Sequence, residues 1–384
     1  MISATRLAWL QLRHGKSRLL VAVAGVAFAV ILMFMQFGFM DALYRGVVNV
    51  HRRLLADLVV VSSHHRSFAG VTRFSRRRLY QALGFEGVAS MSALSTGLAR
   101  WRNPVTAQVR SIFVIGIDPA RPALDVPGIA EGLPLVRHPD VVLFDRFSRP
   151  EFGPVPALLA DGGEVVTEVS LQRVTVGGLV ELGTSFGIDG SIVTSDENFR
   201  RLLPGYPEGA VAVGLLRLVP GADAVTVRNA LAAGLGRDVR VLTRQEFIDG
   251  EVQFWATSTP IGFVFTLGAA MGLVVGGIIV YQILSADIAD HLSEYATLKA
   301  MGHTNRWLSR VVIMQATILA LAGFLPGIVV AWRLHELTRA ATRLPMGIEP
   351  ARAVMVLGLT LLMCWLSGLI AMRKLWAADP ADIF

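Results

Sequence analysis

Four long stretches without a charged residue limit the folds that this sequence can adopt. They cover residues 19–40, 252–286, 311–332 and 353–372. A helix needs about 20 apolar residues to cross the hydrocarbon core of a bilayer, and each stretch reaches that length. Only 17% of the residues are charged, whereas soluble domains have about 25%. The sequence therefore predicts an α-helical membrane protein with four transmembrane helices.

Two of these stretches predict helices that continue beyond the membrane. A polar break at residues 257–260 favours a span over about residues 261–284, preceded by a helical stalk. The first stretch is too long for the apolar core of a signal peptide, and no small-residue cleavage site follows it. We expect an uncleaved anchor that continues past Asp41 as a second stalk.

The distribution of arginine and lysine predicts the orientation. The first 40 residues contain four basic residues and no acidic residue, which favours a cytoplasmic N-terminus. Four spans then place the C-terminus in the cytoplasm, with Arg373 and Lys374 after the last span. The short loop 333–352 opposes this orientation because it is expected outside and carries arginines at 333, 339, 343 and 352. We follow the first helix, which usually dominates.

A large polar segment separates the first two spans. Residues 41–251 contain 23 basic and 22 acidic residues, so this segment is nearly neutral. Residues 56–63, 111–117 and 209–218 are typical of strands, whereas 75–83 and 224–235 are helix candidates. The mixture predicts an α+β domain on the extracytoplasmic side. The net charge of +7 therefore does not indicate nucleic acid as a partner.

Two short motifs resemble enzyme signatures but lack the required context. Residues 183–187 match G-x-S-x-G, a nucleophile motif that needs a following helix. The next residues are typical of a turn and a strand, so we interpret the motif as a glycine-bounded hairpin turn. Residues 15–17 resemble the end of a phosphate-binding loop, but Leu10 stands where that loop needs glycine. We therefore expect a basic collar at the membrane and no ATP site in this chain.

Histidines and arginines in the polar segment also favour a structural interpretation. His51, His64 and His65 lack the spacing of a metal site, so we expect loop histidines and no bound metal. Four arginines, at 73, 76, 77 and 78, are typical of a solvated helix face. No arrangement of nucleophile and base predicts catalysis.

The predicted spans contain small residues but no ionisable ones. A channel or a proton-coupled carrier normally needs intramembrane charges, so both are disfavoured. Small residues at helical spacing let two helix backbones approach closely. They occur at Gly268, Gly272 and Gly276 and at Gly323 and Gly327. Packing within one chain and a seam between two copies both remain open.

The loop between the second and third spans predicts a short amphipathic helix. Ile288, Leu292, Tyr295 and Leu298 recur at three and four residues, with charged residues between them. Gly302 stands where a C-cap is expected, and Lys299 lies in the last turn. A second helix from about residue 305 leads into the third span. An interfacial hairpin on lipid is less favoured, because the six charges of residues 287–310 sum to zero.

This loop carries a specific resemblance. The helix predicted between the second and third of four spans is similar to the coupling helix of FtsX-like permeases. The similar residues, near its end, are Glu294, Leu298, Lys299, Ala300 and Gly302. These permeases are membrane subunits of the MacB-type ABC transporter superfamily. The layout of one span, a large extracytoplasmic domain and three further spans also resembles them. The closing residues 375–384 resemble the ending common in these permeases.

Within that superfamily the sequence most resembles the DevC group of exporter permeases. The similar segments are residues 8–12, 32–44, 74–80, 101–104, 143–153 and 182–187. The G-x-S-x-G stretch belongs to this pattern, which supports its non-catalytic interpretation.

The resemblance implies a domain organisation with a MacB-like periplasmic core. Residues 1–18 are expected to form a cytoplasmic amphipathic segment, 19–55 helix one and its stalk, and 56–244 the periplasmic α+β domain. Residues 245–286 are expected to form a stalk and helix two, followed by the coupling-helix hairpin at 287–310. Helix three is expected at 311–332, a short periplasmic loop at 333–352, helix four at 353–372 and the cytoplasmic tail at 373–384.

The resemblance also implies partners. A separate ABC ATPase dimer is expected to hold ATP and Mg²⁺ and to grip the coupling helix of each copy in a permease homodimer. The expected contact residues are His291, Glu294, Leu298, Lys299 and Gly302, with Tyr295 filling an apolar pocket on the ATPase. Outside, an HlyD-like adaptor and a TolC-like outer-membrane duct are expected. Membrane lipid surrounds the spans, and a lipid, a glycolipid or another amphiphile is the expected cargo.

Two other functions compete with this interpretation. FtsX-like proteins of cell division resemble the chain in span layout, and they control a periplasmic partner without transporting a substrate. A membrane-anchored enzyme is the second alternative, disfavoured because no catalytic constellation is present. The sequence does not identify the cargo.

Overall fold

A computed structural model describes residues 16–377 except 71, 186 and 343. Most of the predicted segment 1–18 and the end of the predicted tail 373–384 lie outside the described residues. The chain divides into two compact units. The helical unit comprises the described parts of residues 1–41, 260–341 and 346–384, and the α/β unit comprises Ala42–Thr259 and Thr342–Pro345.

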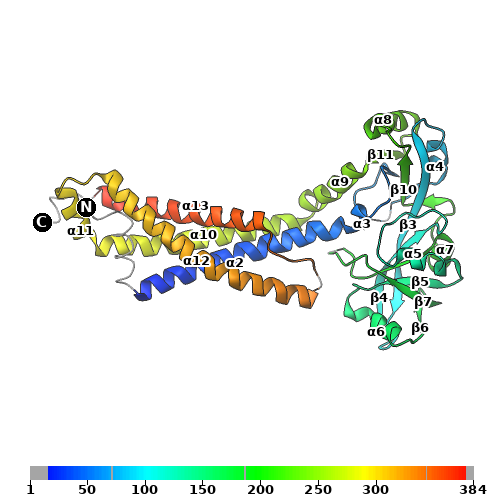
Figure 1. Ribbon diagram of the computed structural model, residues 1–384, viewed down its shortest axis with the longest axis horizontal. Coiled ribbons are helices and arrows are strands. Elements are labelled where there is room, and N and C mark those ends of the chain that lie inside the picture. The colour runs from blue at the N-terminus through cyan, green and yellow to red at the C-terminus, as the bar shows by residue number, and fades with distance from the viewer. Residues whose placement is uncertain (1–15, 71, 186, 343, 378–384) are drawn as a thin grey trace. The chain divides into compact units, whose positions relative to one another are not determined.

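The helical unit contains four helices that are long and apolar enough to cross a membrane (Figure 1). These are α2 (Lys16–Val47), α10 (Pro260–Asp290), α12 (Asn305–Thr342) and α13 (Pro350–Ala377), joined by the short helix α11 (Leu292–Ala300) between α10 and α12. Their shared core consists of aliphatic, aromatic and small side chains from all four helices. The prediction of four membrane helices is confirmed.

The ends of these helices differ from the prediction in one place. Residues 333–352 were expected to be a short loop, but α12 continues to Thr342 and α13 begins at Pro350. The prediction was wrong because charged residues do not end a helix that has left the apolar region. Arg352, a cation that opposed the predicted orientation, is almost buried. It forms a 2.7 Å ion pair with Asp41 and donates to the carbonyl of Gly347.

The α/β unit is built on a mixed sheet of nine strands in the order β11-β1-β10-β3-β4-β8-β5-β7-β6. The strands are β1 (Leu58–Ser62), β3 (Val88–Arg102), β4 (Val109–Ile117), β5 (Val141–Asp145), β6 (Val165–Val169), β7 (Gln172–Val180), β8 (Ser191–Ser195), β10 (Val213–Leu218) and β11 (Val239–Thr243). A two-stranded sheet pairs β2 (Phe74–Ser75) with β9 (Ala210–Val211).

Short helices cover this sheet (Figure 1). They are α3 (Asn49–Arg52), α4 (Arg77–Ala82), α5 (Ile129–Gly132), α6 (Val155–Ala160), α7 (Asp196–Leu202), α8 (Ala224–Gly234) and α9 (Arg244–Thr257), with 3-10 turns η1 (Leu135–Arg137) and η2 (Pro150–Phe152). The expected α+β class is confirmed.

Strand β1 shows how the sequence produces two covered faces. Val59 and Val61 belong to the core that contains Phe247 of α9, whereas Leu58 and Val60 belong to the core that contains Leu79 of α4. Alternate side chains of a strand point to opposite faces, so a continuous apolar run indicates a strand buried on both sides.

The predicted hairpin at residues 183–187 is wrong. Strands β7 and β8 flank this segment in the chain, but β5 lies between them in the sheet. Strand β5 is parallel to β7 and antiparallel to β8. The segment is therefore a crossover loop that leads into a strand. The sequence of this segment indicates a turn between two strands. It cannot show that a third strand, β5, lies between those two strands in the sheet.

Candidate functional site

Helix α11 is separated from α10 by a break at His291. The residue has φ −101° and ψ 15°, outside the helical region. The carbonyl oxygen of Asp287 in α10 accepts both the backbone N–H of His291 at 3.1 Å and its ring Nδ1–H at 2.9 Å. The sequence predicted one amphipathic helix beginning near Ile288. The structure instead assigns Ile288 to the end of α10, because the apolar pattern continues through the break.

The C-terminus of α11 is a Schellman motif. Gly302 has φ +93°, in the left-handed region that favours glycine. Its N–H donates to the carbonyl of Lys299 at 3.0 Å, and the N–H of His303 donates to Leu298 at 3.1 Å. Gly302 thus occupies the C-cap region that the sequence predicted. This motif stops α11 abruptly and lets α12 begin at Asn305.

The two faces of α11 differ from the predicted assignment. Tyr295 is completely buried in the core of the helical unit, so it does not project toward an ATPase; that prediction was wrong. Leu298 is partly buried against the same core. The exposed face consists of Ser293, Glu294, Thr297 and Met301. An aromatic residue at amphipathic spacing fits either face, and only the packing decides between them.

Met301 is a candidate contact residue that the sequence analysis missed. Its side chain is 66% exposed. A large exposed apolar side chain beside Glu294 and Thr297 is suited to a protein contact, because burying it stabilises the complex.

The helices around α11 are joined by polar contacts. Gln315 of α12 is buried and donates to the carboxylate of Asp287 at 3.0 Å. Arg18 of α2 forms an ion pair with Asp290. The end of α10 that leads into α11 is therefore connected to α2 and α12.

The glycines of α12 form a close contact with α2. A Cβ atom added to Gly323 would lie 2.5 Å from Cβ of Val26, and one added to Gly327 would lie 2.8 Å from Cγ1 of Val30. Such distances are too short for carbon atoms in contact. The two glycines therefore let the backbones approach closely within one chain.

The glycines of α10 also face α2. Added Cβ atoms would lie 2.5 Å from the Gln36 amide carbon at Gly268, 3.2 Å from Leu32 Cβ at Gly272 and 2.5 Å from Ala29 Cβ at Gly276. Both glycine motifs thus serve packing inside the helical unit, one of the two interpretations that the sequence left open.

Comparisons with known proteins identify the helical unit. Residues 266–380 match the family model described as FtsX-like permease C-terminal. This part of the chain is an FtsX-like permease domain. The matched residues include most of α10, all of α11 and α12, and α13. The comparison with curated proteins found no similar sequence.

Solved structures similar to part of the chain include regions of two transporters. One is the periplasmic region of MacB from Actinobacillus actinomycetemcomitans, at 10% identity and a TM-score of 0.34, covering 56% of this chain and 97% of that chain. The other is the extracellular domain of the noncanonic ABC-type transporter YknZ from Gram-positive bacteria. It is 12% identical, with a TM-score of 0.32, and the match covers 49% of this chain and 99% of that chain.

In the α/β unit, Glu251 of α9 is a buried acceptor. Its carboxylate accepts hydrogen bonds from Ser67 Oγ at 2.7 Å, Phe68 N–H at 2.8 Å and Trp255 Nε1 at 2.9 Å. His51 Nε2 of α3 lies 3.5 Å away. Burial alone would raise the pKa of Glu251, but His51, Ser67 and Trp255 outweigh it and hold the pKa below its ordinary value.

The prediction that His51, His64 and His65 lie in loops is therefore only partly correct. His51 is helical and completely buried, and its ring packs 4.4 Å from the ring of Phe247 between centroids. His65 is also buried, and burial lowers its pKa to about 4. Sequence spacing could not reveal the partner of His51, because Glu251 lies far along the chain. Within the described ranges, no group of three or more His, Cys, Asp or Glu residues is placed to hold a metal ion.

The crossover loop after β7 connects the nine-stranded sheet to α3 and α9. Asp145 of β5 accepts the N–H groups of Leu182 and Gly183 at 3.0 Å each. The amide of Asn49, in α3, donates to the carbonyl of Leu182. Gly187 approaches the Trp255 ring of α9, where an added Cβ would lie 3.4 Å from the indole. Burial raises the pKa of Asp145 to about 6, although these backbone hydrogen bonds oppose the shift.

The arginine cluster at residues 73–78 is not simply solvated, contrary to the prediction. Arg76 forms an ion pair with Asp196, and Arg78 forms one with Asp238 at 2.7 Å. The guanidinium of Arg73 lies 4.3 Å from the centre of the Tyr206 ring. These arginines join α4 and its surroundings to distant parts of the chain, and sequence alone could not place those acidic partners.

Proposed function

We propose that this FtsX-like permease is the membrane subunit of an ABC exporter whose ATPase is a separate chain. The observation that carries the proposal is the match of residues 266–380, which includes α11. The exposed face of α11 presents Glu294, Thr297 and Met301, which we assign to the ATPase contact together with His291, Leu298, Lys299 and Gly302. ATP and Mg²⁺ belong to the ATPase.

Movement of α11 is the proposed output of ATP hydrolysis. The contacts Asp287–Gln315 and Arg18–Asp290 connect the base of α11 to α12 and α2. Helix α2 is followed by α3, and α10 is preceded by α9. Both α3 and α9 are bound to the sheet through Glu251 and the crossover loop. In this proposal, movement of α2 and α10 reaches α3 and α9 along the chain.

The wider assembly follows from the family resemblance. We propose cytoplasmic termini, a periplasmic α/β unit, a permease homodimer in the inner membrane, an HlyD-like adaptor and a TolC-like duct. An apolar stripe of α10 that includes Phe263, Leu267, Met271, Val274 and Ile278 is exposed, and it suits lipid or the second copy. The DevC-like segments support a lipid, a glycolipid or another amphiphile as cargo.

Co-purification tests the proposal. The permease is expressed with the ABC ATPase encoded beside it, and the complex is isolated through a tag on the permease. We expect Glu294→Lys and Met301→Glu to reduce ATPase recovery at least tenfold, because each places a charge in the contact. Glu336→Lys is the matched control, since Glu336 is an acid at the far end of α12. Equal recovery from all three variants would refute the docking site.

The mechanotransducer without a cargo is the competing function. It shares the ATPase contact but requires no amphiphile in the culture medium or outer membrane. Loss of an exported amphiphile in a Glu294→Lys strain supports export. An unchanged lipid profile together with altered cell-wall cleavage supports signalling.

A further inference from the structure

Strand β3 has an open edge along its first half. It pairs with β10 over residues 88–94, but its pairing with β4 on the other side begins only at Leu94, opposite Ile117. A cavity of about 410 Å³ lies beside this open stretch, and residues 89–92 of β3 line it. Four consecutive strand residues therefore border a space that no strand of the described chain occupies.

Backbone groups of the open stretch point toward this space. The N–H of Asn103, directly after β3, donates to the carbonyl of Gln108 on the β4 side at 2.8 Å. Backbone groups of a strand alternate between its two neighbours, so those of Met91 and Ala93 point to the same side. Strand β4 does not reach them, because it ends at Ile117. Met91 and Ala93 therefore offer donors and acceptors to an added strand.

The sequence of the open stretch does not block pairing. Natural proteins protect exposed strand edges with charged residues, proline or β-bulges. Residues 90–93 read Ser-Met-Ser-Ala, without charge or proline. The register with β10 shifts between Arg217, which pairs with Ser90, and Leu218, which pairs with Val88. This irregularity lies at the end of the open stretch, so residues 90–93 remain regular.

The cavity beside this edge carries positive charge. Arg121, in the loop after β4, and Arg217 of β10 line it, and no acid among the described residues does. Arg121 lies 3.9 Å from Asp118. Within the described ranges Arg217 forms no ion pair, and its Nε–H donates to the carbonyl of Leu55 at 3.2 Å. Because Arg217 pairs with Ser90, its guanidinium charge is available beside the open edge.

We propose that this edge binds an extended acidic segment of a partner protein, which adds a strand to the sheet beside residues 90–93. In such complexes main-chain hydrogen bonds supply affinity, and alternate side chains supply specificity. A strand edge recognises a peptide backbone, and Arg217 favours a carboxylate on the incoming strand. Leu83 also lines the cavity and is 39% exposed, so it offers an apolar contact. The proposal requires neither the ATPase nor transport.

The test uses the full chain in maltoside detergent, without ATPase or nucleotide. The probe is the fluorescent hexapeptide Thr-Val-Glu-Val-Glu-Val with blocked ends. Two counterparts carry lysine in place of glutamate or proline in place of valine. Fluorescence polarisation measures binding, and mass spectrometry measures hydrogen exchange of residues 88–93. We expect saturable binding of the glutamate peptide, roughly tenfold weaker binding of the lysine peptide, and slower exchange at residues 88–93 when the glutamate peptide is bound.

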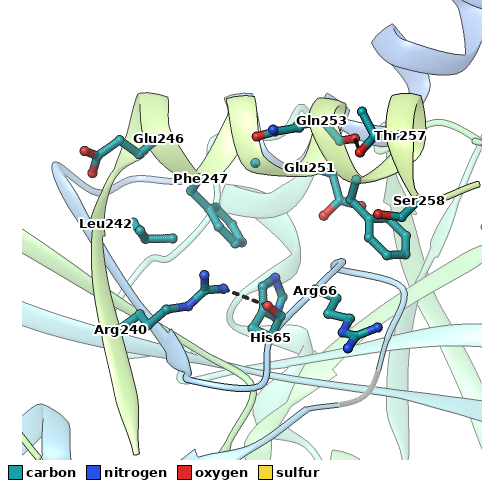
Figure 2. Close-up of a pocket in the computed structure, with 12 residues that line it drawn as sticks. His65, Arg66, Arg240, Leu242, Glu246, Phe247, Glu251, Gln253, Thr257 and Ser258 are labelled. Atoms are coloured by element: carbon teal, nitrogen blue, oxygen red, sulfur yellow. Dashed lines mark hydrogen bonds between the residues drawn. The ribbon is translucent and has the colours of Figure 1, made fainter. Parts of the chain in front are cut away.

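A charge reversal beside the edge tests the same contact. Arg217→Glu should weaken binding of the glutamate peptide roughly tenfold or more. Arg66→Glu is the matched control and should leave binding unchanged. Figure 2 shows Arg66 and Arg240 in a separate pocket beside α9, whose lining also contains Glu246 and Glu251.

The outcomes separate the possible occupants of the edge. Absence of saturable binding, or equal affinity for the glutamate and lysine peptides, overturns the acidic segment. Equal affinity for the proline peptide, or unchanged exchange at residues 88–93 on binding, overturns strand addition. Protection of residues 88–93 that rises with protein concentration in the absence of peptide overturns the partner segment in favour of a second copy of the chain. These measurements on the wild type do not depend on the folding of Arg217→Glu.

Discussion

His51 Nε2 lies 3.5 Å from a carboxylate oxygen of Glu251, and both side chains are buried. His51 belongs to α3, which follows the first membrane helix, and Glu251 belongs to α9, which precedes the second. Their contact joins the two stalks inside the α/β unit. A buried carboxylate is stable only when donors surround it, so this contact holds α3, α9 and the segment around Ser67 in one arrangement.

Removing the carboxylate should destabilise the α/β unit strongly. Glu251→Ala leaves three donors and His51 without their acceptor, and such changes cost about 3 kcal/mol. Urea unfolding of the full chain, followed by tryptophan fluorescence, measures the change. Glu181→Ala is the control, because Glu181 forms a half-exposed ion pair with Arg146 and should cost less than about 1 kcal/mol. If Glu251→Ala and Glu181→Ala lowered the free energy of unfolding equally, the central role of Glu251 would be contradicted.

The burial of His65 predicts a pH dependence. Burial lowers its pKa from 6.5 to about 4, with the charges of His51 and Arg240 acting in the same direction and Glu251 opposing. Between these values the unfolded chain binds a proton that the folded chain does not, so the free energy of unfolding falls as the pH falls. His65→Gln should remove this contribution. The free energy of unfolding is measured for wild type and His65→Gln from pH 7.5 to 4. The difference between the two should favour wild type most at high pH. A difference that does not change with pH would contradict the prediction.

The glycine contacts predict different tolerance to a methyl group in two membrane helices. Gly323→Ala places a Cβ atom 2.5 Å from Val26 and should lower the midpoint of thermal unfolding, with a cost of about 1–3 kcal/mol. Gly358→Ala is the control, because an added Cβ atom at Gly358 meets nothing within 4 Å. Thermal unfolding in one detergent compares the two. A larger effect at Gly358 would argue for a seam between copies.

The Schellman motif of α11 predicts a coupling defect. Gly302→Ala forces a side chain into φ +93° and should cost about 1 kcal/mol locally. Gly302→Pro also removes the N–H bond to Lys299, so it should disrupt the helix end more severely. Both variants should insert normally into the membrane but show reduced ATPase recovery and stimulation. Gly250→Ala, in α9, is an open-space control. Full stimulation in Gly302→Pro would refute the role of this end of α11.

Much of the organisation could be predicted from the sequence. Long charge-free stretches predict membrane helices, because a helix satisfies its backbone hydrogen bonds within one segment and can therefore lie in lipid. The polar break before Pro260 and the position of Gly302 also predicted real boundaries. The α+β class followed from strand-like and helix-like runs. In each case the physical cause is local, since it depends on residues within a few positions of each other.

Contacts between distant segments were decided only by the tertiary structure. Tyr295 faces the helical core, although its spacing fits a partner-facing residue equally well. The loop 183–187 is a crossover, because β5 is inserted between two strands that are neighbours in the chain. The pairing of His51 with Glu251 and the convergence of Arg66 with Arg240 join residues far apart in sequence. Hydropathy and spacing determine which segments fold as helices and strands, but only packing determines which side chains remain available to a partner.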